Sequence, residues 1–156
     1  MGWFALGIFL MCILNIVALY CNALYSDNDY SHKQQKIEHV VLFKFRPNIT
    51  AGEKQEIINR FLALKNSRKN GAPYIALLEY GYQNSKEKIK GNYDIGFRVS
   101  FTSEADRDYY VGKPFLMAPG TYDPMHEDFK NFVGSYLDSD PENPNKGILV
   151  FDYKAL

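Results

Sequence analysis

The chain has 156 residues, of which 46% are hydrophobic and 15% aromatic, and its 18 Lys and Arg residues balance 18 Asp and Glu residues. This length predicts one domain with ample material for a core, and the balanced charge argues against nucleic acid as the natural partner. Both cysteines, Cys12 and Cys21, lie near the N-terminus, which excludes a disulfide framework or a zinc–cysteine site in the rest of the chain.

The first segment, residues 2–24, carries no charged side chain. One interpretation is a secretory signal peptide ending at Ala23, with Cys21 and Ala23 as the small residues before the cleavage site. The other is an uncleaved transmembrane anchor, because about 20 apolar residues span a bilayer core. Both predict a secreted or membrane-anchored protein with its domain on the lumenal or extracellular side. The polar residues 25–36 then read as a linker, and residues 37–156 as the domain.

A possible glycosylation site follows the start of the domain. Asn48-Ile49-Thr50 is an N-glycosylation sequon, which fits a lumenal location. A three-residue pattern also arises often by chance, so both interpretations stay open for Asn48.

The domain begins with a predicted strand and a predicted helix. Residues 38–45 are rich in β-branched and aromatic side chains on both faces, which indicates a strand covered on both sides. Thr50 and Glu53 have the spacing of a capping box. The helix that they begin is expected to run to about Lys69, with an apolar stripe of Ile57, Ile58, Phe61, Leu62 and Leu64.

Two more strands are predicted in the middle of the chain. In residues 74–82, alternation places Ile75 and Leu77 on one face, and the other face carries Ala76, Leu78, Tyr80 and Tyr82. Residues 93–101 alternate cleanly, with five apolar side chains on one face: Tyr93, Ile95, Phe97, Val99 and Phe101. The lysine-rich segment 84–91 between them is interpreted as a solvated connection.

The last third of the chain predicts a short helix, a loop, a second long helix and a strand. Ser103 is the expected cap of the short helix, residues 112–122 form the loop, and residues 148–153 form the strand. Asp123-Pro124 is a favourable start for the long helix, since Asp caps free backbone N–H groups and Pro fits the first helical position.

One histidine falls in the first turn of that helix. His126 is expected near the positive end of the helix dipole, which disfavours the imidazolium ion and lowers the pKa. A neutral imidazole at physiological pH is a usable general base. The alternative is a partly exposed histidine that pairs with a neighbouring carboxylate.

The order of elements predicts an α+β fold of the ferredoxin-like βαββαβ type. In that fold one four-stranded antiparallel sheet carries its helices on a single face. The opposite face would here carry large apolar residues, which are unfavourable in water. A second copy of the sheet would cover them, so the pattern favours a homodimer that closes a barrel-like cavity.

Several motifs in this order resemble the stress-responsive dimeric α/β-barrel (Dabb) family across residues 37–153. They are His39 to Phe45, the Thr50–Glu53 helix start, Asp108-Tyr109-Tyr110, Asp123-Pro124 with His126 and Phe129, and Val150 to Tyr153. The family includes stress-induced proteins of plants and microbes, and olivetolic acid cyclase-like polyketide cyclases that need no cofactor. The resemblance implies a dimeric α+β barrel with a cavity between the sheet and its helices.

The resemblance also implies site residues. Tyr109 and His126 match the catalytic positions, as hydrogen-bond donor and base of an aldol-type ring closure, and Tyr110 is the alternative phenol. Substrate-binding positions match His39, Val41, Phe43, Ile57, Ile58, Phe61, Phe97 and Tyr110. Residues 113–122 exceed the family's usual connection and would act as a lid or displace His126.

Other interpretations of these residues stay open. A histidine on an apolar strand face, such as His39, more often belongs to the core than to a binding site. The aromatic residues are likewise more often core residues than pocket-lining ones. Three histidines without an acidic cluster predict no metal site. The functional hypotheses are therefore a cofactor-free cyclase or lyase for a small apolar substrate, or a non-catalytic dimer that binds small ligands or protects against stress.

Overall fold

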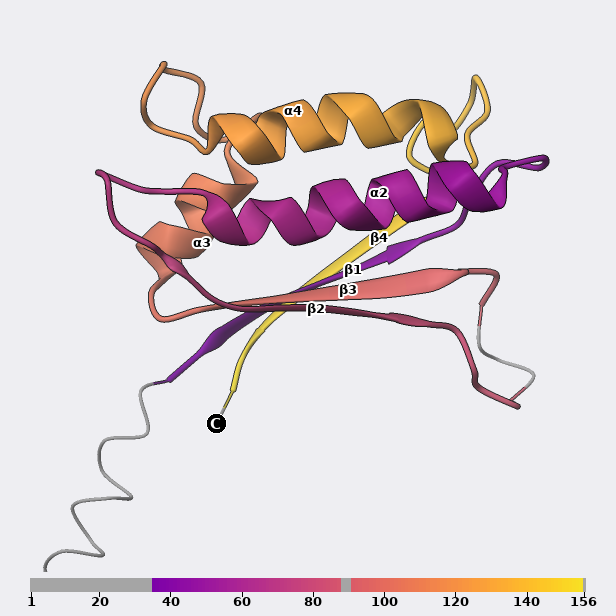
Figure 1. Cartoon of the computed structure of the whole chain (residues 1–156), viewed down its shortest axis with the longest axis horizontal. Coiled ribbons are helices and arrows are strands. Elements are labelled where there is room, and N and C mark those ends of the chain that lie inside the picture. Colours follow the sequence, from indigo (N-terminus) through magenta and orange to yellow (C-terminus); the bar gives the residue numbers. More distant parts are fainter. Residues whose placement is uncertain (1–34, 88–90, 156) are drawn as a thin grey trace, which may run out of the picture. The chain divides into compact units, whose positions relative to one another are not determined.

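The computed structural model of the protein describes residues 35–87 and 91–155 (Figure 1). The chain divides into two units, residues 1–34 and 35–156, and the description below concerns the second. The predicted signal peptide or anchor therefore lies outside the described residues, as do most of the linker and both cysteines. Within the described ranges, no helix has the length and hydropathy needed to cross a membrane.

The domain is built on one four-stranded antiparallel sheet with the strand order β2-β3-β1-β4 (Figure 1). The strands are β1 (Ile37–Phe43), β2 (Ile75–Tyr82), β3 (Ile95–Phe101) and β4 (Ile148–Lys154). This order is the one that a ferredoxin-like βαββαβ chain produces, so the predicted α+β fold class is confirmed.

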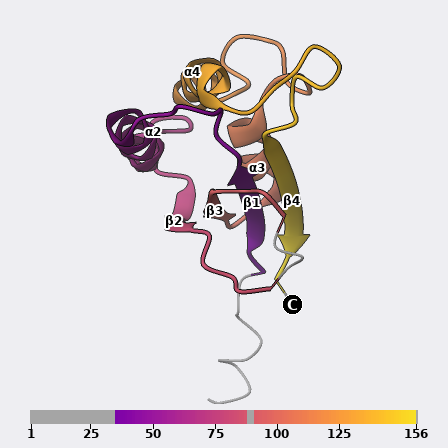
Figure 2. The same cartoon turned by 90° about the vertical axis from the view of Figure 1, so that its right-hand side faces the viewer.

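The helices lie on one face of this sheet. They are α2 (Ala51–Ala63), α3 (Glu104–Val111) and α4 (Pro124–Val133), and short 3₁₀ turns follow α2 and α4. Figures 1 and 2 show α2 and α4 side by side in a layer above the strands. The capping box of Thr50 and Glu53 is present, with the Thr50 hydroxyl accepting from the Glu53 amide and the Glu53 carboxylate accepting from the Thr50 amide.

The α2 helix ends earlier than the sequence predicted. Its last residue is Ala63 rather than Lys69, and a 3₁₀ turn carries the chain to Ser67, where the backbone becomes extended. The Ser67 hydroxyl donates to the buried Asp123 carboxylate at 2.6 Å. This contact joins residues 56 positions apart and holds the chain away from the helix axis. Helical periodicity cannot predict it, because the partner lies far away along the sequence.

The β2 strand contains an irregularity that alternation did not predict. Ile75 pairs with Phe101, and Leu77 pairs with the next residue back, Ser100. Because one extra residue is inserted, Ile75 lies on the same face as Leu78 and not on that of Leu77. The predicted faces of β2 are therefore wrong for Ile75 and right for the residues that follow.

The core lies between the sheet and its helices. Its most deeply buried side chains are aliphatic or aromatic: Ile57, Ile58, Leu64, Ile95, Val99 and Phe101. The Phe61 ring of α2 sits 4.3 Å from the Phe97 ring of β3 and 6.0 Å from the Phe129 ring of α4. Helix and sheet are thus joined directly by aromatic packing.

The opposite face of the sheet carries no helix of the described residues (Figures 1 and 2). Its β4 side chains Leu149, Phe151 and Tyr153 are 40%, 59% and 39% exposed. The prediction of large apolar residues on an uncovered face is therefore confirmed.

Gly147 provides a test of the packing where the chain enters β4. A Cβ atom there would lie 2.7 Å from backbone atoms of Lys44 and Asp138, whereas at Gly134 it would meet nothing within 4 Å. We expect Gly147→Ala to lower the free energy of unfolding by about 1–3 kcal/mol, because backbone must move. Gly134→Ala, the control, is expected to leave it unchanged or raise it, as Ala restricts the unfolded chain. Urea denaturation of both variants measures this, and equal stabilities would contradict the packing described.

Candidate functional site

The α4 helix begins as the sequence predicted. Asp123 is its N-cap and Pro124 its first residue. The Asp123 Oδ1 atom accepts from the amides of Met125 at 2.8 Å and His126 at 3.3 Å. His126 is buried, with 8% of its surface exposed, so it is not the partly exposed histidine of the alternative interpretation.

The His126 imidazole is held in one hydrogen-bonding state. Its Nδ1 atom lies 2.5 Å from the backbone carbonyl oxygen of Tyr110, and a carbonyl can only accept, so Nδ1 carries the proton. Nε2 is then an acceptor. Burial lowers the pKa of His126 from 6.5 to about 3; the hydrogen bond to the Tyr110 carbonyl opposes this shift, and the nearby Lys130 charge adds to it. The ring is therefore neutral at physiological pH.

Tyr110 lies between two buried histidines. Its ring stacks on His126, with centroids 3.7 Å apart, and meets the edge of His39 at 5.6 Å. Burial raises the pKa of the Tyr110 hydroxyl well above its usual value, so the phenol is neutral. We call His39, Tyr110 and His126 the His–Tyr–His cluster.

His39 is oriented by a carboxylate. Its Nδ1 atom donates to Asp152 Oδ1 at 2.7 Å, and Arg107 donates to the other oxygen, Oδ2, at 2.6 Å. Burial alone would raise the pKa of Asp152, but the contacts with His39 and Arg107 bring it below its usual value. This arrangement fixes the orientation of the His39 ring.

Tyr109 lies in a different environment from Tyr110. Its hydroxyl donates to the Arg68 carbonyl at 3.3 Å, and its ring meets the edge of the Tyr74 ring at 5.3 Å. The tyrosine in contact with His126 is therefore Tyr110, the alternative phenol of the sequence analysis. The catalytic pairing of Tyr109 with His126 stays a prediction.

A second polar cluster supports the start of α4. Asp123 is only 1% exposed, and its Oδ2 atom accepts from the hydroxyls of Ser67 and Tyr74. Sequence reasoning identified Asp123 as a cap but missed both hydroxyl donors. No local pattern marks them, because they lie 49 and 56 residues away along the chain.

The predicted apolar substrate-binding residues lie together, but in the core. Val41 is partly buried and packs on the core, while Phe43 and Phe97 lie 5.0 Å apart between their centroids. Ile57, Ile58 and Phe61 project from α2 onto the same strands and are at most 3% exposed. These residues contribute to the core, and their substrate-binding role stays a prediction.

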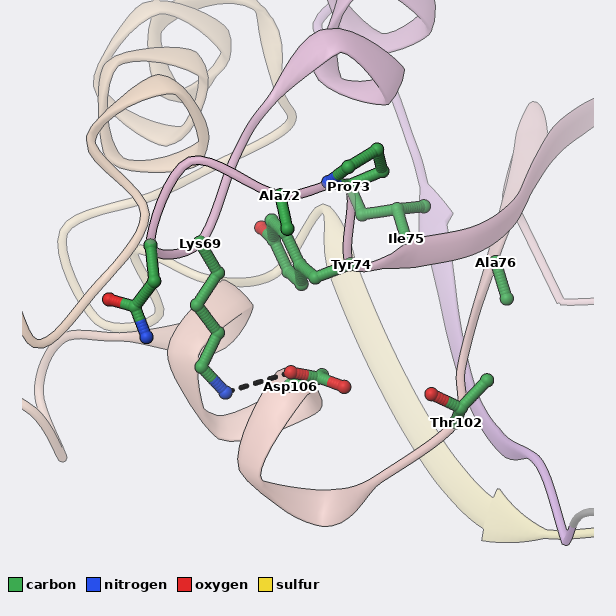
Figure 3. A pocket seen from close by; sticks show the side chains of 9 residues that line it. Lys69, Ala72, Pro73, Tyr74, Ile75, Ala76, Thr102 and Asp106 are labelled. Atoms are coloured by element: carbon green, nitrogen blue, oxygen red, sulfur yellow. Dashed lines mark hydrogen bonds and ion pairs between the residues drawn. The ribbon is translucent and has the colours of Figure 1, made fainter.

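A pocket of about 470 Å³ lies at the end of the domain (Figure 3). It is lined by Lys69 to Ala76 except Gly71, and by Thr102 and Asp106. In Figure 3 the Lys69 ammonium reaches across to the Asp106 carboxylate, a contact of 2.8 Å that occupies the charged groups of this pocket. Of the predicted site residues, none lines it.

The remaining predicted features occupy the surface. Asn48 is exposed in the turn between β1 and α2 with a φ of 70°, which leaves the glycosylation prediction open. The 113–122 insertion projects from the domain, and its Phe115 is 82% exposed. Across the described ranges, no three His, Cys, Asp or Glu residues are grouped as metal ligands.

Comparison with known proteins identifies a family and a set of similar folds. Residues 37–155 match the profile of the stress responsive A/B barrel domain, Dabb. A structure from Arabidopsis thaliana is 21% identical over 77% of this chain and 95% of its own, with a TM-score of 0.59. A dimeric ferredoxin-like protein of unknown function from Jannaschia is 19% identical over 77% and 99%, with a TM-score of 0.55.

A third structure has a named activity. The hydroxynitrile lyase from Passiflora edulis is 15% identical to this chain over 79% of its length and 95% of the lyase, with a TM-score of 0.53. No curated protein sequence matches the chain. At these identities the structures establish a common fold.

The buried state of His126 predicts a pH dependence of stability. The folded pKa of about 3 lies below the ordinary value of 6.5, so the unfolded chain binds the proton more readily between those values. Stability is therefore complete above pH 6.5 and falls with decreasing pH, at up to about 1.4 kcal/mol per pH unit from this residue. His126→Asn keeps a side-chain N–H for the Tyr110 carbonyl but cannot titrate. Its urea-unfolding free energy should fall less steeply below pH 6.5, and parallel curves for the two proteins would contradict the assignment.

Proposed function

Because the chain belongs to the stress responsive A/B barrel domain family, we propose that its domain is a cofactor-free lyase or cyclase for a small carbonyl compound. In this proposal His126 is the base and a tyrosine hydroxyl is the donor, as the sequence suggested. The structure favours Tyr110 over Tyr109 for the second role, since Tyr110 contacts His126.

The observation that carries the proposal is the His–Tyr–His cluster itself. Its phenol lies between two buried imidazoles, with the Tyr110 ring centroid 3.7 Å from that of His126 and 5.6 Å from that of His39. Imidazole and phenol groups placed side by side suit general acid–base chemistry. A substrate with a carbonyl or hydroxyl group would supply both a donor and an acceptor to them.

The chemistry follows from these groups. Cleavage of a cyanohydrin needs a base for the hydroxyl proton as the carbon–cyanide bond breaks, and an aldol closure needs a base for a proton beside a carbonyl. His126 Nε2 would accept that proton, and the Tyr110 hydroxyl would donate a hydrogen bond to the oxygen that carries developing charge. His39, oriented by Asp152, would bind the substrate's hydroxyl.

The low pKa of His126 has a consequence for such a reaction. In the empty site the imidazolium ion is unfavourable because it is buried, so His126 alone is a weak base. A negative charge that develops on the substrate beside the ring would stabilise the imidazolium ion. Proton transfer would then be coupled to formation of the anion, which confines the chemistry to substrates that form one. The lyase activity of the Passiflora edulis structure with the same fold supports this class of reaction.

A second candidate function is favoured by the packing. Between the sheet and α2, the predicted pocket residues form a dense aromatic core around Phe61 and Phe97. A protein with this interior serves equally as a non-catalytic, ligand-binding or stress-protective dimer. In that case Tyr110 and the histidines are core residues.

The proposal includes a homodimer. The uncovered face of the sheet exposes Leu149, Phe151 and Tyr153, and burial of such a surface is favourable. The Jannaschia structure with this fold is described as dimeric, which supports the same assembly here. The secreted or membrane-anchored location expected from residues 2–24 is part of the proposal as well.

Two probe reactions test the catalytic proposal. Cleavage of mandelonitrile is followed by benzaldehyde absorbance, and closure of 2,6-heptanedione is followed by its cyclohexenone product. We expect the full chain to accelerate one of them. Tyr110→Phe and His126→Asn should each lower kcat/KM by about 10²–10⁴-fold, the usual contribution of one acid or base group.

The comparison variants are Tyr109→Phe and Tyr136→Phe. Tyr109→Phe decides between the two tyrosines, and a loss as large as that of Tyr110→Phe would return the donor role to Tyr109. Tyr136 stacks on Phe132 at 5.0 Å, outside the cluster, and controls for the loss of any hydroxyl. Turnover that survives both Tyr110→Phe and His126→Asn would overturn the catalytic assignment. Absence of turnover with both probes would favour the ligand-binding dimer.

A further inference from the structure

The uncovered face of the sheet has two halves of opposite shape. Strand pairing places its side chains in rows that run from β4 through β1 and β3 to β2. One row consists of Leu149, Leu42, Gly96 and Gly81, and the next consists of Phe151, Val40, Arg98 and Glu79. Large side chains thus gather at the β4 edge, and glycines at the β2 edge.

The β4 edge forms an apolar ridge. We call Leu149, Phe151 and Tyr153 the β4 ridge; they alternate along the strand and point away from the helices. Phe151 is the most exposed of them at 59%, and its ring lies 5.8 Å from that of Tyr153. An aromatic pair of this kind, on a strand that no helix covers, is a strong candidate for an interface.

The β2 edge forms a hollow. Gly81 and Gly96 are directly paired; a Cβ atom placed on Gly81 would meet nothing within 4 Å, whereas one placed on Gly96 would lie 3.1 Å from the Leu42 side chain, so the hollow is open above Gly81. The two glycines and Leu42 contribute to a pocket of about 200 Å³. We call Gly81, Gly96 and Leu42 the glycine trough.

The charged residues beside the trough are paired within the protomer. Arg98 Nε lies 2.9 Å from Glu79 Oε1, and Glu38, which is 5% exposed, accepts from the Ser100 hydroxyl at 2.6 Å. The carboxylate of Glu38 is also 3.8 Å from Arg98. An apolar surface can therefore cover this strip without leaving an isolated charge, which would be costly.

We propose that the β4 ridge of each protomer packs into the glycine trough of its partner, with Phe151 as the principal contact. In a two-fold dimer, any contact from one surface to another occurs twice. Ridge and trough lie at opposite edges of one face, so a two-fold axis that runs between the two facing sheets, close to parallel to the strands, brings each ridge onto a trough. The proposal rests on the homodimer of the proposed function and specifies its register. It is independent of the lyase assignment.

The sharpest test is Gly81→Val. Valine suits a β-strand, and the space around Gly81 is open, so the protomer should fold at least as stably as the wild type. The same side chain fills the trough, so we expect the dimer dissociation constant to rise by at least tenfold. Sedimentation equilibrium of the full chain in density-matched detergent measures the dimer, and urea denaturation measures the protomer.

The ridge is tested by Phe151→Ala, with Val150→Ala as its matched control. Both residues lie on β4 and are similarly exposed, at 59% and 55%, but Val150 points to the helix side. Phe151→Ala should raise the dimer dissociation constant at least tenfold, and Val150→Ala should raise it less than twofold. In the Gly81→Val background, Phe151→Ala should raise the dissociation constant by less than a further twofold, because ridge and trough form one contact.

The outcomes separate this proposal from the one on which it rests. A wild-type chain that stays monomeric overturns both the homodimer and the ridge-and-trough contact. A stable dimer that tolerates Gly81→Val and Phe151→Ala overturns the ridge-and-trough contact alone. Selective weakening by those two variants supports both.

Discussion

The buried carboxylate of Asp123 determines where α4 begins and therefore where His126 lies. One oxygen caps α4 and the other accepts from Ser67 and Tyr74, so a single side chain joins the end of α2, the start of β2 and the start of α4. Because α4 begins there, His126 falls in its first turn, under the ring of Tyr110.

Two features of this domain are not explained by the packing of its core. On the helix side of the sheet, the His–Tyr–His cluster places a phenol between two buried imidazoles. On the opposite face, an apolar ridge lies beside a glycine trough and stays uncovered, because a single helical layer covers only one side of a four-stranded sheet. We propose a small ligand for the first feature and another copy of the chain for the second.

The sequence predicted what is local and missed what is long-range. The capping box at Thr50, the Asp123-Pro124 helix start and the alternation of β3 all depend on neighbours within a few residues, and the structure has them. The early end of α2 at Ala63 and the irregularity after Ile75 depend on contacts across the fold or on one inserted residue. For the same reason, spacing alone did not determine which of Tyr109 and Tyr110 lies against His126. The packing distances around Phe61 were equally out of reach, because periodicity identifies buried positions but not how their side chains meet.

The central claim is that His126 is a neutral imidazole with its proton on Nδ1, buried against Tyr110 in the folded protein. Nitrogen-15 NMR of histidine-labelled protein measures it directly, because the two ring nitrogens report protonation separately. The account predicts one protonated Nδ1 and one unprotonated Nε2 for His126, unchanged from neutral pH down to about pH 5, well below the ordinary pKa. A His126 signal that titrates near the ordinary value, or one with the proton on Nε2, would contradict it.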